Sequence, residues 1–587
     1  MALCGPGCMG FLNAARGVRA IGYVEPYPTP DGPIALVTHS GSAFSALLRT
    51  RRQLGFTLAV SSGQEIVTTT AEYLEYALAL EQTRVVALLL ETVRDVPRLR
   101  AALELAEQRD VPVVMLTVGA TSAGGRLVTA HSGALAGSDA AFEALAERHN
   151  LIRVGDLEEL AETVELLSAG RRAAATGPTG GIATVHDSGA ERALAADVAS
   201  RLSVPFARIG AGTTATVAAM LDPGLSAENP LDLWGTGADT RRLFTDALIA
   251  FAADEEVAAV ALCVDLVHEL DGDTSYEDAA LAAARSTDKP VAVLSNLSSA
   301  VDCEAASRLR RAGVPVLEGT RSGLGALGAL LRHRDGRVFR EHRGSTGDQP
   351  ADGARRNRWL ETLSAGRLDA TATFRLLADY GISSAPAHAA ASRDEVLAAA
   401  RALGYPLVLK TNDPAVAHKS EVGGVLSDLR TEAELLVAYL DLAARLGPEV
   451  LVASMCPAGV DVAVGITTDP LVGPLVVVGA GGTLVEVIGE RAVAFPPLDD
   501  MSAARLLSRL PSLSTLLAGV RGAPAVAPGV VAAAVAAVST MALELCIDGA
   551  GGLLELDVNP LRCRPGQALA LDALVVRDVP PGTQKIT

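Results

Sequence analysis

Short, continuous apolar runs alternate with helical patterns along the first part of the chain. The runs at 33–38, 85–90 and 111–116 have the length and composition of buried strands, and residues 97–107 have the apolar spacing of a helix. Continuous apolar strands between helices are typical of a parallel sheet that is covered on both faces. The pattern therefore predicts a doubly wound, flavodoxin- or Rossmann-like α/β domain over residues 31–172, whose ligands bind at the carboxyl ends of the strands.

The same pattern begins again near residue 175. Apolar runs at 180–185, 257–264 and 290–294, together with a helical pattern at 190–202, predict a second doubly wound domain over residues 173–335.

A different pattern occupies the last part of the chain. Residues 336–358 are polar and charged, which predicts an interdomain linker. Residues 359–587 predict an α+β domain. Its helical patterns lie at 368–380 and 396–403, and its short strand patterns at 406–410, 450–452, 460–467, 474–478 and 553–558.

Charge and cysteine content narrow the classes of function. The 587 residues have a formal net charge of -18, whereas nucleic-acid binding requires a basic face. The seven cysteines are scattered, without C-x-x-C pairs or clusters at zinc spacing, which favours a reduced, cytoplasmic protein. The apolar stretches at 471–478 and 530–538 are too short or too interrupted to span a bilayer, and the N-terminus lacks the pattern of a signal peptide. We therefore expect neither nucleic acid nor a membrane as a partner.

His131 is the centre of the most specific stretch. It lies in Thr-Ala-His-Ser-Gly-Ala-Leu-Ala-Gly (129–137), between a Gly/Ser-rich run and a helical pattern. A ring on such a loop is accessible, and nearby backbone amides can hold a phosphate that the ring carries. Neutral imidazole is a nucleophile at pH 7. His131 is therefore a candidate phosphohistidine, and an ordinary histidine of a surface loop is the alternative.

Two turns are candidates to hold that phosphate. Ser40, Gly41 and Ser42 follow the strand at 33–38 and begin a helix, and Ser188 and Gly189 do the same after the strand at 180–185. Helix N-termini bind anions through unpaired N–H groups and the helix dipole.

Glu91 is the candidate carboxylate of the same site. It ends the strand at 85–90, and a carboxylate that orients one ring nitrogen lets the other attack phosphorus. Because parallel strands share one carboxyl edge, we expect the turn at 39–42, Glu91 and His131 in one crevice. His39 and His186 are assigned no role.

The sequence His-Ser-Gly-Ala-Leu-Ala-Gly (131–137) resembles the phosphohistidine loop of the ADP-forming acyl-CoA synthetases, which are relatives of succinyl-CoA synthetase. In that relative, a glutamate at the strand end corresponding to Glu91 contacts the active histidine. Residues 5–10 resemble Gly-Pro-Asn-Cys-x-Gly, which closes the CoA-binding domain of the family, with Gly7 in place of Asn. Residues 1–30 would then be a remnant of that domain, and the chain is either shortened or completed by another polypeptide. Residues 227–232 match an Asn-Pro-x-Asp segment of the second domain of the family.

Two motifs of residues 359–587 resemble the phosphate-handling part of an ATP-grasp module. Lys410 ends a strand, like the family's lysine that reaches nucleotide phosphates, and a snorkelling surface lysine is the alternative. Residues 417–424, Ala-His-Lys-Ser-Glu-Val-Gly-Gly, match a pattern specific to the family. The resemblance implies that the histidine of this motif, His418, carries phosphate between ATP and the distant His131.

Glu-Leu-Asp-Val-Asn-Pro (555–560) looks like the magnesium segment of the module. Strand alternation places Glu555, Asp557 and Asn559 on one face, and their oxygen atoms suit Mg²⁺. The resemblance implies that Asn559 and Asp572 are the ligands, assisted by Asp557. An acidic strand end with an Asn-Pro turn is the alternative.

Gly-Ala-Gly-Gly (479–482), followed by Val-Glu, resembles the glycine-rich nucleotide segment of the family. The resemblance implies that Gly481, Gly482 and Glu486 contact the nucleotide. Asp461 and Ser454 replace the Glu, and the Gln or Glu, that are usual in the family, so the choice between ATP and GTP stays open.

The motifs, in this order, imply an acid–CoA ligase of the NDP-forming type, which interconverts acyl-CoA, ADP and phosphate with carboxylate, CoA and ATP. ATP or ADP and Mg²⁺ are the implied cofactors, with coenzyme A as a substrate. A separate CoA-binding domain and a second copy of the chain in a homodimer are candidate macromolecular partners, and the sequence does not decide between them.

Two alternatives remain. The chain could be a partner-dependent or regulatory ligase-like subunit without independent catalysis. A direct ATP-grasp carboxylate ligase without a relay would leave His131 and the two doubly wound domains unexplained. The sequence does not identify the acid, because the acyl pocket is defined by its shape.

Overall fold

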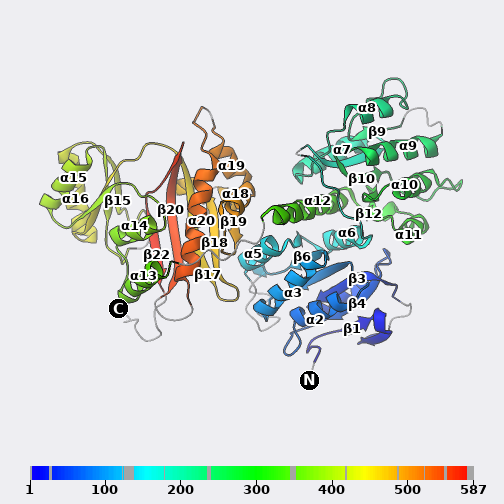
Figure 1. The fold of residues 1–587 in the computed structure, drawn as a ribbon, viewed down its shortest axis with the longest axis horizontal. Helices are drawn as coiled ribbons and strands as arrows, with labels where there is room; N and C mark the ends of the chain where they lie inside the picture. The colour runs from blue at the N-terminus through cyan, green and yellow to red at the C-terminus, as the bar shows by residue number, and fades with distance from the viewer. Residues whose placement is uncertain are drawn as a thin grey trace. The chain divides into compact units, whose positions relative to one another are not determined.

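The computed structural model describes residues 3–24, 29–121, 123–124, 138–177, 179–234, 239–343, 352–416, 419–484, 488–520, 522–547 and 552–577. They form two compact units, residues 1–344 and residues 345–587 (Figure 1). Among the predicted site residues, His131, His418 and Glu486 lie outside the described residues.

The first sheet has the strand order β2-β1-β4-β3-β5-β6-β7 and is parallel from β4 to β7. Its strands are β1 (Gly10–Asn13), β2 (Val18–Ile21), β3 (Asp31–Thr38), β4 (Phe56–Ser61), β5 (Val85–Leu90), β6 (Val113–Thr117) and β7 (Ile152–Val154). The helices are α1 (Gly41–Leu48), α2 (Thr70–Ala79), α3 (Val96–Gln108), α5 (Asp139–His149) and α6 (Leu157–Ser168). The predicted strands at 33–38, 85–90 and 111–116 are confirmed by β3, β5 and β6, and β5 is buried at every position.

Residues 10–21 form a hairpin that the sequence did not predict. β1 pairs antiparallel with β2 and with β4, and Leu12 is buried in the core that this sheet contributes to. The segment expected to be the remnant of another domain therefore adds two strands to the first sheet. The added strands cover the edge of β4, which would otherwise expose unpaired backbone groups.

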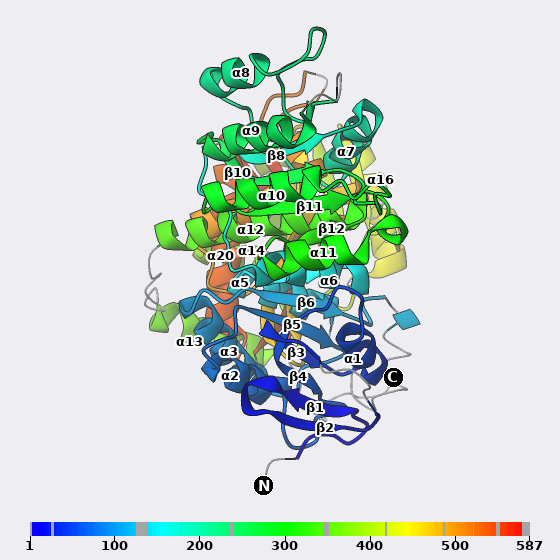
Figure 2. The same ribbon diagram turned by 90° about the vertical axis from the view of Figure 1, so that its right-hand side faces the viewer.

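The second sheet is parallel throughout and has the order β12-β11-β10-β8-β9. Its strands are β8 (Gly181–His186), β9 (Leu231–Asp232), β10 (Val257–Cys263), β11 (Val291–Ser295) and β12 (Val316–Glu318). The helices are α7 (Gly189–Arg201), α8 (Ala211–Ala218), α9 (Thr240–Ala253), α10 (Ser275–Ser286), α11 (Cys303–Arg311) and α12 (Thr320–Arg343). α9 packs on β8 and β10, and α10 packs on β11 (Figure 2). The second doubly wound sheet is thus confirmed.

The predicted linker at 336–358 is largely helical where it is described. α12 runs on to Arg343, and α13 (Gly353–Ala365) begins before the predicted end of the linker. The apolar first half of α12, with Leu324, Leu327 and Leu331 buried, anchors a polar second half that has no packing signal of its own.

The two sheets of residues 1–344 share one hydrophobic core, because α6 of the first sheet packs against α12 of the second. A buried ion network joins the same elements. Arg52 is 4% exposed and its guanidinium donates to Glu162 at 2.6 and 3.2 Å and to Glu165 at 3.0 Å, both on α6. Glu162 in turn accepts the backbone N–H of Glu318, on β12, at 2.8 Å.

Residues 345–587 contain a small and a large sheet. The small sheet, β13-β16-β14-β15, is antiparallel and comprises β13 (Ala387–Ala390), β14 (Leu407–Thr411), β15 (Val425–Leu429) and β16 (Val450–Ser454). The large sheet, β19-β18-β17-β20-β21 with β22 beside β20, comprises β17 (Val460–Asp469), β18 (Gly473–Ala480), β19 (Arg491–Ala494), β20 (Leu553–Arg564), β21 (Gln567–Ala570) and β22 (Ala573–Arg577). The other helices are α14 (Ala370–Asp379), α15 (Arg393–Leu403), α16 (Glu432–Leu446), α18 (Asp500–Ser508), α19 (Pro511–Leu517) and α20 (Pro528–Leu545). This is the predicted α+β arrangement.

α20 is the one helix of the described residues that is long and apolar enough to cross a membrane. It packs on β17, β18 and α18, and 56% of it is buried. Its apolar surface is therefore used in the core of the large sheet.

Candidate functional site

The first predicted anion-binding turn begins helix α1. Ser40 Oγ accepts a hydrogen bond from the N–H of Ala43 at 3.2 Å, and Thr38 Oγ1 accepts one from the N–H of Ser40 at 3.0 Å. These bonds fix the start of the helix at Gly41. The free N–H groups of the first helical turn and the positive end of the helix dipole lie at the carboxyl edge of the sheet, which is a geometry that binds phosphoryl groups.

Glu91 lies at the same edge. β3 and β5 are neighbouring parallel strands, with Thr38 opposite Leu89, and Glu91 directly follows β5. Its backbone N–H donates to Nδ1 of His39 at 3.0 Å, and the residue is 9% exposed. The structure thus brings Glu91 together with Ser40, Gly41 and Ser42.

His39 is part of a buried cluster that sequence reasoning missed. Its Nε2 lies 3.1 Å from Oε1 of Glu65, and the Thr70 hydroxyl donates to the same oxygen at 2.5 Å. Hydrogen bonds from His39 and Thr70 hold the pKa of the Glu65 carboxyl below its usual value, against the opposing effect of burial. Glu65 lies in the loop between β4 and α2, where no periodic pattern marks it.

The second predicted turn has more acidic surroundings. Ser188 caps α7 by accepting the N–H of Glu191 at 3.4 Å, and a Cβ on Gly189 would lie 2.8 Å from Oδ2 of Asp232. Asp187, beside the turn, accepts the hydroxyl hydrogen of Tyr276 at 2.8 Å. Burial, together with the neighbouring charges of Asp265 and Asp232, raises the pKa of Asp187. An anion at this turn would meet carboxylates, unlike an anion at the start of α1.

Lys410 lies on β14 and is buried, with 8% of the residue exposed. Its Nζ donates to the carbonyl oxygen of Leu571 at 2.6 Å, next to Asp572. Burial lowers the pKa of the ammonium group, and the charge of Asp572 opposes this shift. The position is that of a lysine held inside a site rather than one snorkelling to the surface.

Asn559 and Asp572 meet beside this lysine. The N–H of Asn559 donates to the carbonyl oxygen of Asp572 at 3.2 Å, and Oδ1 of Asn559 accepts the N–H of Gly482 at 2.9 Å. Gly482 has a φ of 62°, a left-handed conformation that favours glycine. The carboxylate of Asp572 is paired with Nζ of Lys419 at 2.8 Å. This pairing joins residues 153 positions apart, and no local sequence signal indicates it.

The backbone of the glycine-rich segment is tied to β17. The N–H of Gly481 donates to the carbonyl oxygen of Asp461 at 2.8 Å, and the Asp461 carboxylate binds Arg562 in a fork at 2.8 and 2.9 Å. Asp461, which replaces the glutamate usual in the family, therefore forms an ion pair with Arg562 through both of its carboxylate oxygens.

The oxygen donors fit a magnesium ion that is shared with a nucleotide. Mg²⁺ usually takes one or two protein carboxylates and completes its shell with phosphates and water. Asp572 and Asn559, joined by a backbone hydrogen bond, supply oxygen atoms of this kind, of which the Asp572 carboxylate is paired with Lys419 and Oδ1 of Asn559 accepts from Gly482. Within the part of the chain that the structure describes, no group of three or more His, Cys, Asp or Glu side chains could hold a metal ion by itself.

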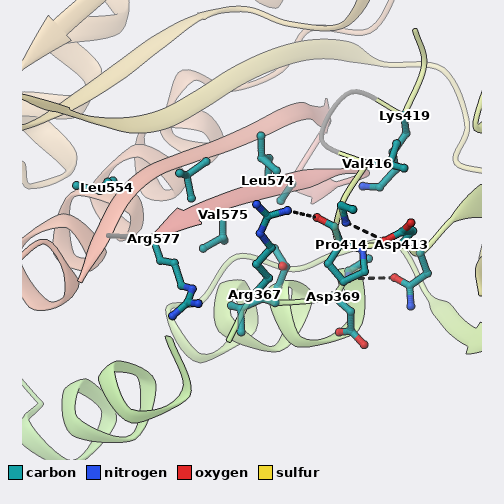
Figure 3. A pocket seen from close by; sticks show the side chains of 17 residues that line it. Arg367, Asp369, Asp413, Pro414, Val416, Lys419, Leu554, Leu574, Val575 and Arg577 are labelled. Atoms are coloured by element: carbon teal, nitrogen blue, oxygen red, sulfur yellow. Dashed lines mark hydrogen bonds between the residues drawn. The ribbon is translucent and has the colours of Figure 1, made fainter. Parts of the chain in front are cut away.

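A cavity of about 440 Å³ lies beside this group of residues (Figure 3). Loop 412–416, the start of α14 and strand β22 line it. Lys419 and Asp413 approach it from the segment after β14, and Arg577 approaches from β22 (Figure 3). The cavity thus adjoins the segment that contains the motif of His418.

Asp557 lies two residues before Asn559 on β20. It is opposite Gly465 of β17 and lines a second cavity, of about 400 Å³, together with Glu555, Gly479 and Arg491. Glu555 and Asp557 thus lie on one face of β20, as the alternation predicts, while for Asn559, the third residue of that prediction, it stays a prediction.

Comparisons with known proteins match both units. Residues 31–167 match the model of the succinyl-CoA ligase-like flavodoxin domain, and residues 361–576 match that of the ATP-grasp domain. A trans-feruloyl-CoA synthase of an unknown prokaryotic organism is 27% identical over 98% of this chain and 81% of its own. The acetate–CoA ligase (ADP-forming) I of Archaeoglobus fulgidus is 28% identical over 95% of this chain and 80% of its own.

A solved structure has the same fold over part of the chain. It is the dinucleotide-forming acetyl-coenzyme A synthetase 1 of Candidatus Korarchaeum cryptofilum in complex with phosphate and ADP, with a TM-score of 0.51 and 18% identity, covering 59% of this chain and 73% of that one. The two domain models and the relatives that match nearly the whole sequence agree with the motifs. The chain belongs to the family of the ADP-forming acyl-CoA synthetases.

Proposed function

We propose that the chain is an acid–CoA ligase of the NDP-forming type, which converts acyl-CoA, ADP and phosphate into carboxylate, CoA and ATP, reversibly, through phosphohistidines at His131 and His418. The observation that carries the proposal is the meeting of Glu91 with the N-terminus of α1 at one sheet edge, whose N–H groups can hold a phosphoryl group. The nucleotide residues gather in the other unit, around Lys410.

The chemistry on residues 1–344 has two steps. A phosphate oxygen attacks the thioester carbonyl, the C–S bond breaks, and an acyl phosphate and the CoA thiolate form. A nitrogen of the neutral His131 ring then attacks phosphorus, the P–O bond breaks, and the carboxylate leaves. The Glu91 carboxylate accepts a hydrogen bond from the N–H of the other ring nitrogen and stabilises the positive charge that develops on the ring. The N–H groups of Ser42 and its neighbours hold the phosphoryl oxygens.

The remaining steps use residues 345–587. The phosphoryl group passes to His418 and then to the terminal phosphate oxygen of ADP. Lys410 holds the nucleotide phosphates, and the N–H groups of Gly481 and Gly482, with Glu486, contact the nucleotide. Asn559 and Asp572, with Asp557 assisting, would hold Mg²⁺, which neutralises charge on the phosphates. A histidine that carries the phosphoryl group covalently can transfer it from one unit of the chain to the other.

The partners follow from the reaction. They are a small carboxylic acid or its CoA thioester, a nucleotide and phosphate. The macromolecular partners that we propose are a separate CoA-binding domain and a second copy of the chain in a homodimer. The seven cysteines are free in the structure, which fits the cytoplasmic location that we propose.

The test is to incubate the purified chain with Mg²⁺ and γ-labelled ATP and to map acid-labile, alkali-stable phosphate by mass spectrometry. We expect label on His131 or His418, and loss of turnover in His131→Ala. His268→Ala is the matched control, because this exposed histidine pairs with Asp302 outside the proposed site. Full ligase activity in His131→Ala would refute the relay. Bound ATP without any label would favour a partner-dependent subunit.

A further inference from the structure

We propose that His39 is a positioning residue for the phosphohistidine chemistry: its ring, held by Glu65, fixes the backbone of Glu91 and with it the carboxylate that orients His131. This inference rests on the function proposed above. It assigns a role to a buried histidine that the sequence left without one.

The ring of His39 takes the place of a backbone carbonyl. The N–H of His39 donates to the carbonyl oxygen of Leu89 at 3.0 Å, which continues the ladder between β3 and β5. The next N–H on that side belongs to Glu91, directly after β5, and in a continued parallel ladder it would donate to a carbonyl of the neighbouring strand. The chain turns into α1 there, and the N–H of Glu91 donates to Nδ1 of His39 at 3.0 Å instead. The side chain thereby extends the sheet by one bond, up to the functional carboxylate.

The hydrogen bonds also define the tautomer of the ring. Because Nδ1 accepts from Glu91, the hydrogen of the neutral ring is on Nε2, which donates to Glu65 at 3.1 Å. A protonated ring would place an N–H against the N–H of Glu91 and break that bond. Glu65 thus sets which nitrogen faces Glu91, as carboxylates do for functional histidines elsewhere.

The cluster is built to hold one geometry. His39 is 7% exposed and Glu65 is 4% exposed, so water does not compete for their bonds. Thr70, the first residue of α2, donates to Glu65 at 2.5 Å and anchors it to a helix. His39 also directly precedes Ser40, the cap of α1. One imidazole therefore couples the two parts of the proposed phosphate site, namely the start of α1 and Glu91.

Three substitutions of His39 distinguish the role of Nδ1 from that of Nε2. In His39→Asn, the amide oxygen can take the place of Nδ1 and accept from Glu91. In His39→Gln, the longer side chain can reach Glu65 but offers no acceptor at the place of Nδ1. His39→Ala removes both contacts. We expect turnover of the Gln and Ala variants to fall by about 10–100-fold, the usual effect of losing a residue that orients a functional group. We expect His39→Asn to keep most of its turnover, and the KM for ATP to be unchanged in all three.

A double-mutant cycle with Glu91→Gln tests whether His39 acts through Glu91. If it does, His39→Ala lowers turnover much less in the Glu91→Gln background than in the wild type. Hydrogen exchange at the peptide containing Glu91 should rise in the Ala and Gln variants and stay slow in His39→Asn.

The outcomes are distinguishable. Equal losses from His39→Ala in both backgrounds, or equal activity of the Asn and Gln variants, would overturn the role of His39 while leaving the relay intact. Wild-type chain that acquires no label on His131 or His418 would overturn the proposed function. If His39→Ala fails to fold, the Asn and Gln pair decides, because both keep a polar side chain and differ in the nitrogen that they imitate.

Discussion

Replacing Arg52 with methionine is the most direct test of how residues 1–344 are held together. Arg52 follows α1, and its guanidinium binds Glu158, Glu162 and Glu165 of α6. Methionine keeps much of the apolar stem and removes five hydrogen bonds: four to these carboxylates and one, at 3.4 Å, to the carbonyl oxygen of Val316. Glu162 has no exposed surface, so its carboxylate would lose its ion-pair partner in a dry site.

The expected cost is large because a buried charge is left behind. Removing one partner of a buried ion pair costs about 3–5 kcal/mol. Burial already raises the pKa of the Glu162 carboxyl to about 8, even with Arg52 in place. Without the guanidinium this pKa rises further above the value of the unfolded chain. The stability of the variant is therefore highest at low pH, where the carboxyl is protonated in both states, and it falls as the pH rises through the pKa of the folded state.

The assay is urea denaturation in a Trp359→Phe background, in which Trp234 is the one remaining tryptophan and reports on residues 1–344. Arg98→Met is the matched control. Arg98 forms a similar fork with Glu75, at 2.7 and 2.9 Å, but on the surface. We expect no resolvable change in its free energy of unfolding, because exposed ion pairs are screened by water and salt.

Equal effects of the two substitutions would refute the reasoning, because the two sites differ mainly in burial. Below about pH 8 the Glu162 carboxyl is protonated in both folded proteins, so the cost of Arg52→Met should grow as the pH rises past 8. A cost that does not grow between pH 7 and pH 9 would show that the orphaned carboxylate of Glu162 is not its origin.

Two further predictions concern nucleotide binding and acid stability. Replacing Lys410 with methionine removes the ammonium group that donates to Leu571, next to Asp572. We expect the Kd for Mg-ATP in calorimetry to rise by about tenfold or more, as for loss of a charge-assisted contact to phosphate. Lys289→Met is the control, since Lys289 donates to a backbone carbonyl in the same way, at 2.5 Å, in the other unit, and unchanged binding in Lys410→Met would remove Lys410 from the site. Burial lowers the pKa of His333 to about 3, so the unfolded chain takes up a proton below pH 6.5 that the folded chain does not, and stability is lost as the pH falls. His333→Leu should reduce this loss by up to about 1.4 kcal/mol per pH unit between pH 6.5 and 4, and an unchanged slope in urea titrations would contradict it.

The sheets could be predicted from the sequence where burial leaves a local pattern. β3, β5 and β6 read as continuous apolar runs, because helices cover both faces of the sheet. The turn at 40–42 was predictable because a capping serine follows a strand and precedes a helical pattern. The α+β unit was predictable from motifs at Lys410 and Asn559.

Other features have no local signal. The hairpin at 10–21 is half-exposed and depends on pairing with β4. Glu162 and Glu165 look like the solvated face of an amphipathic helix, and their burial depends on Arg52, more than 100 positions away. His39 was left without a role because its partners, Glu65 and Glu91, are distant in sequence and neither belongs to a motif that includes it. Contacts of this kind arise from tertiary packing, which periodicity does not encode.

The hydrophobic core that the two sheets of residues 1–344 share determines where the gene could be split into two separate chains. α6 and α12 are each other's packing partner, so separating residues 1–172 from 173–344 would expose two apolar faces that have evolved to remain covered. A break near residue 344 leaves the cores of both units complete, because each core is built from residues of one unit. Among the described residues, the boundary between the two units is therefore a position that tolerates gene fission or fusion, while the two doubly wound sheets are inherited as a single piece.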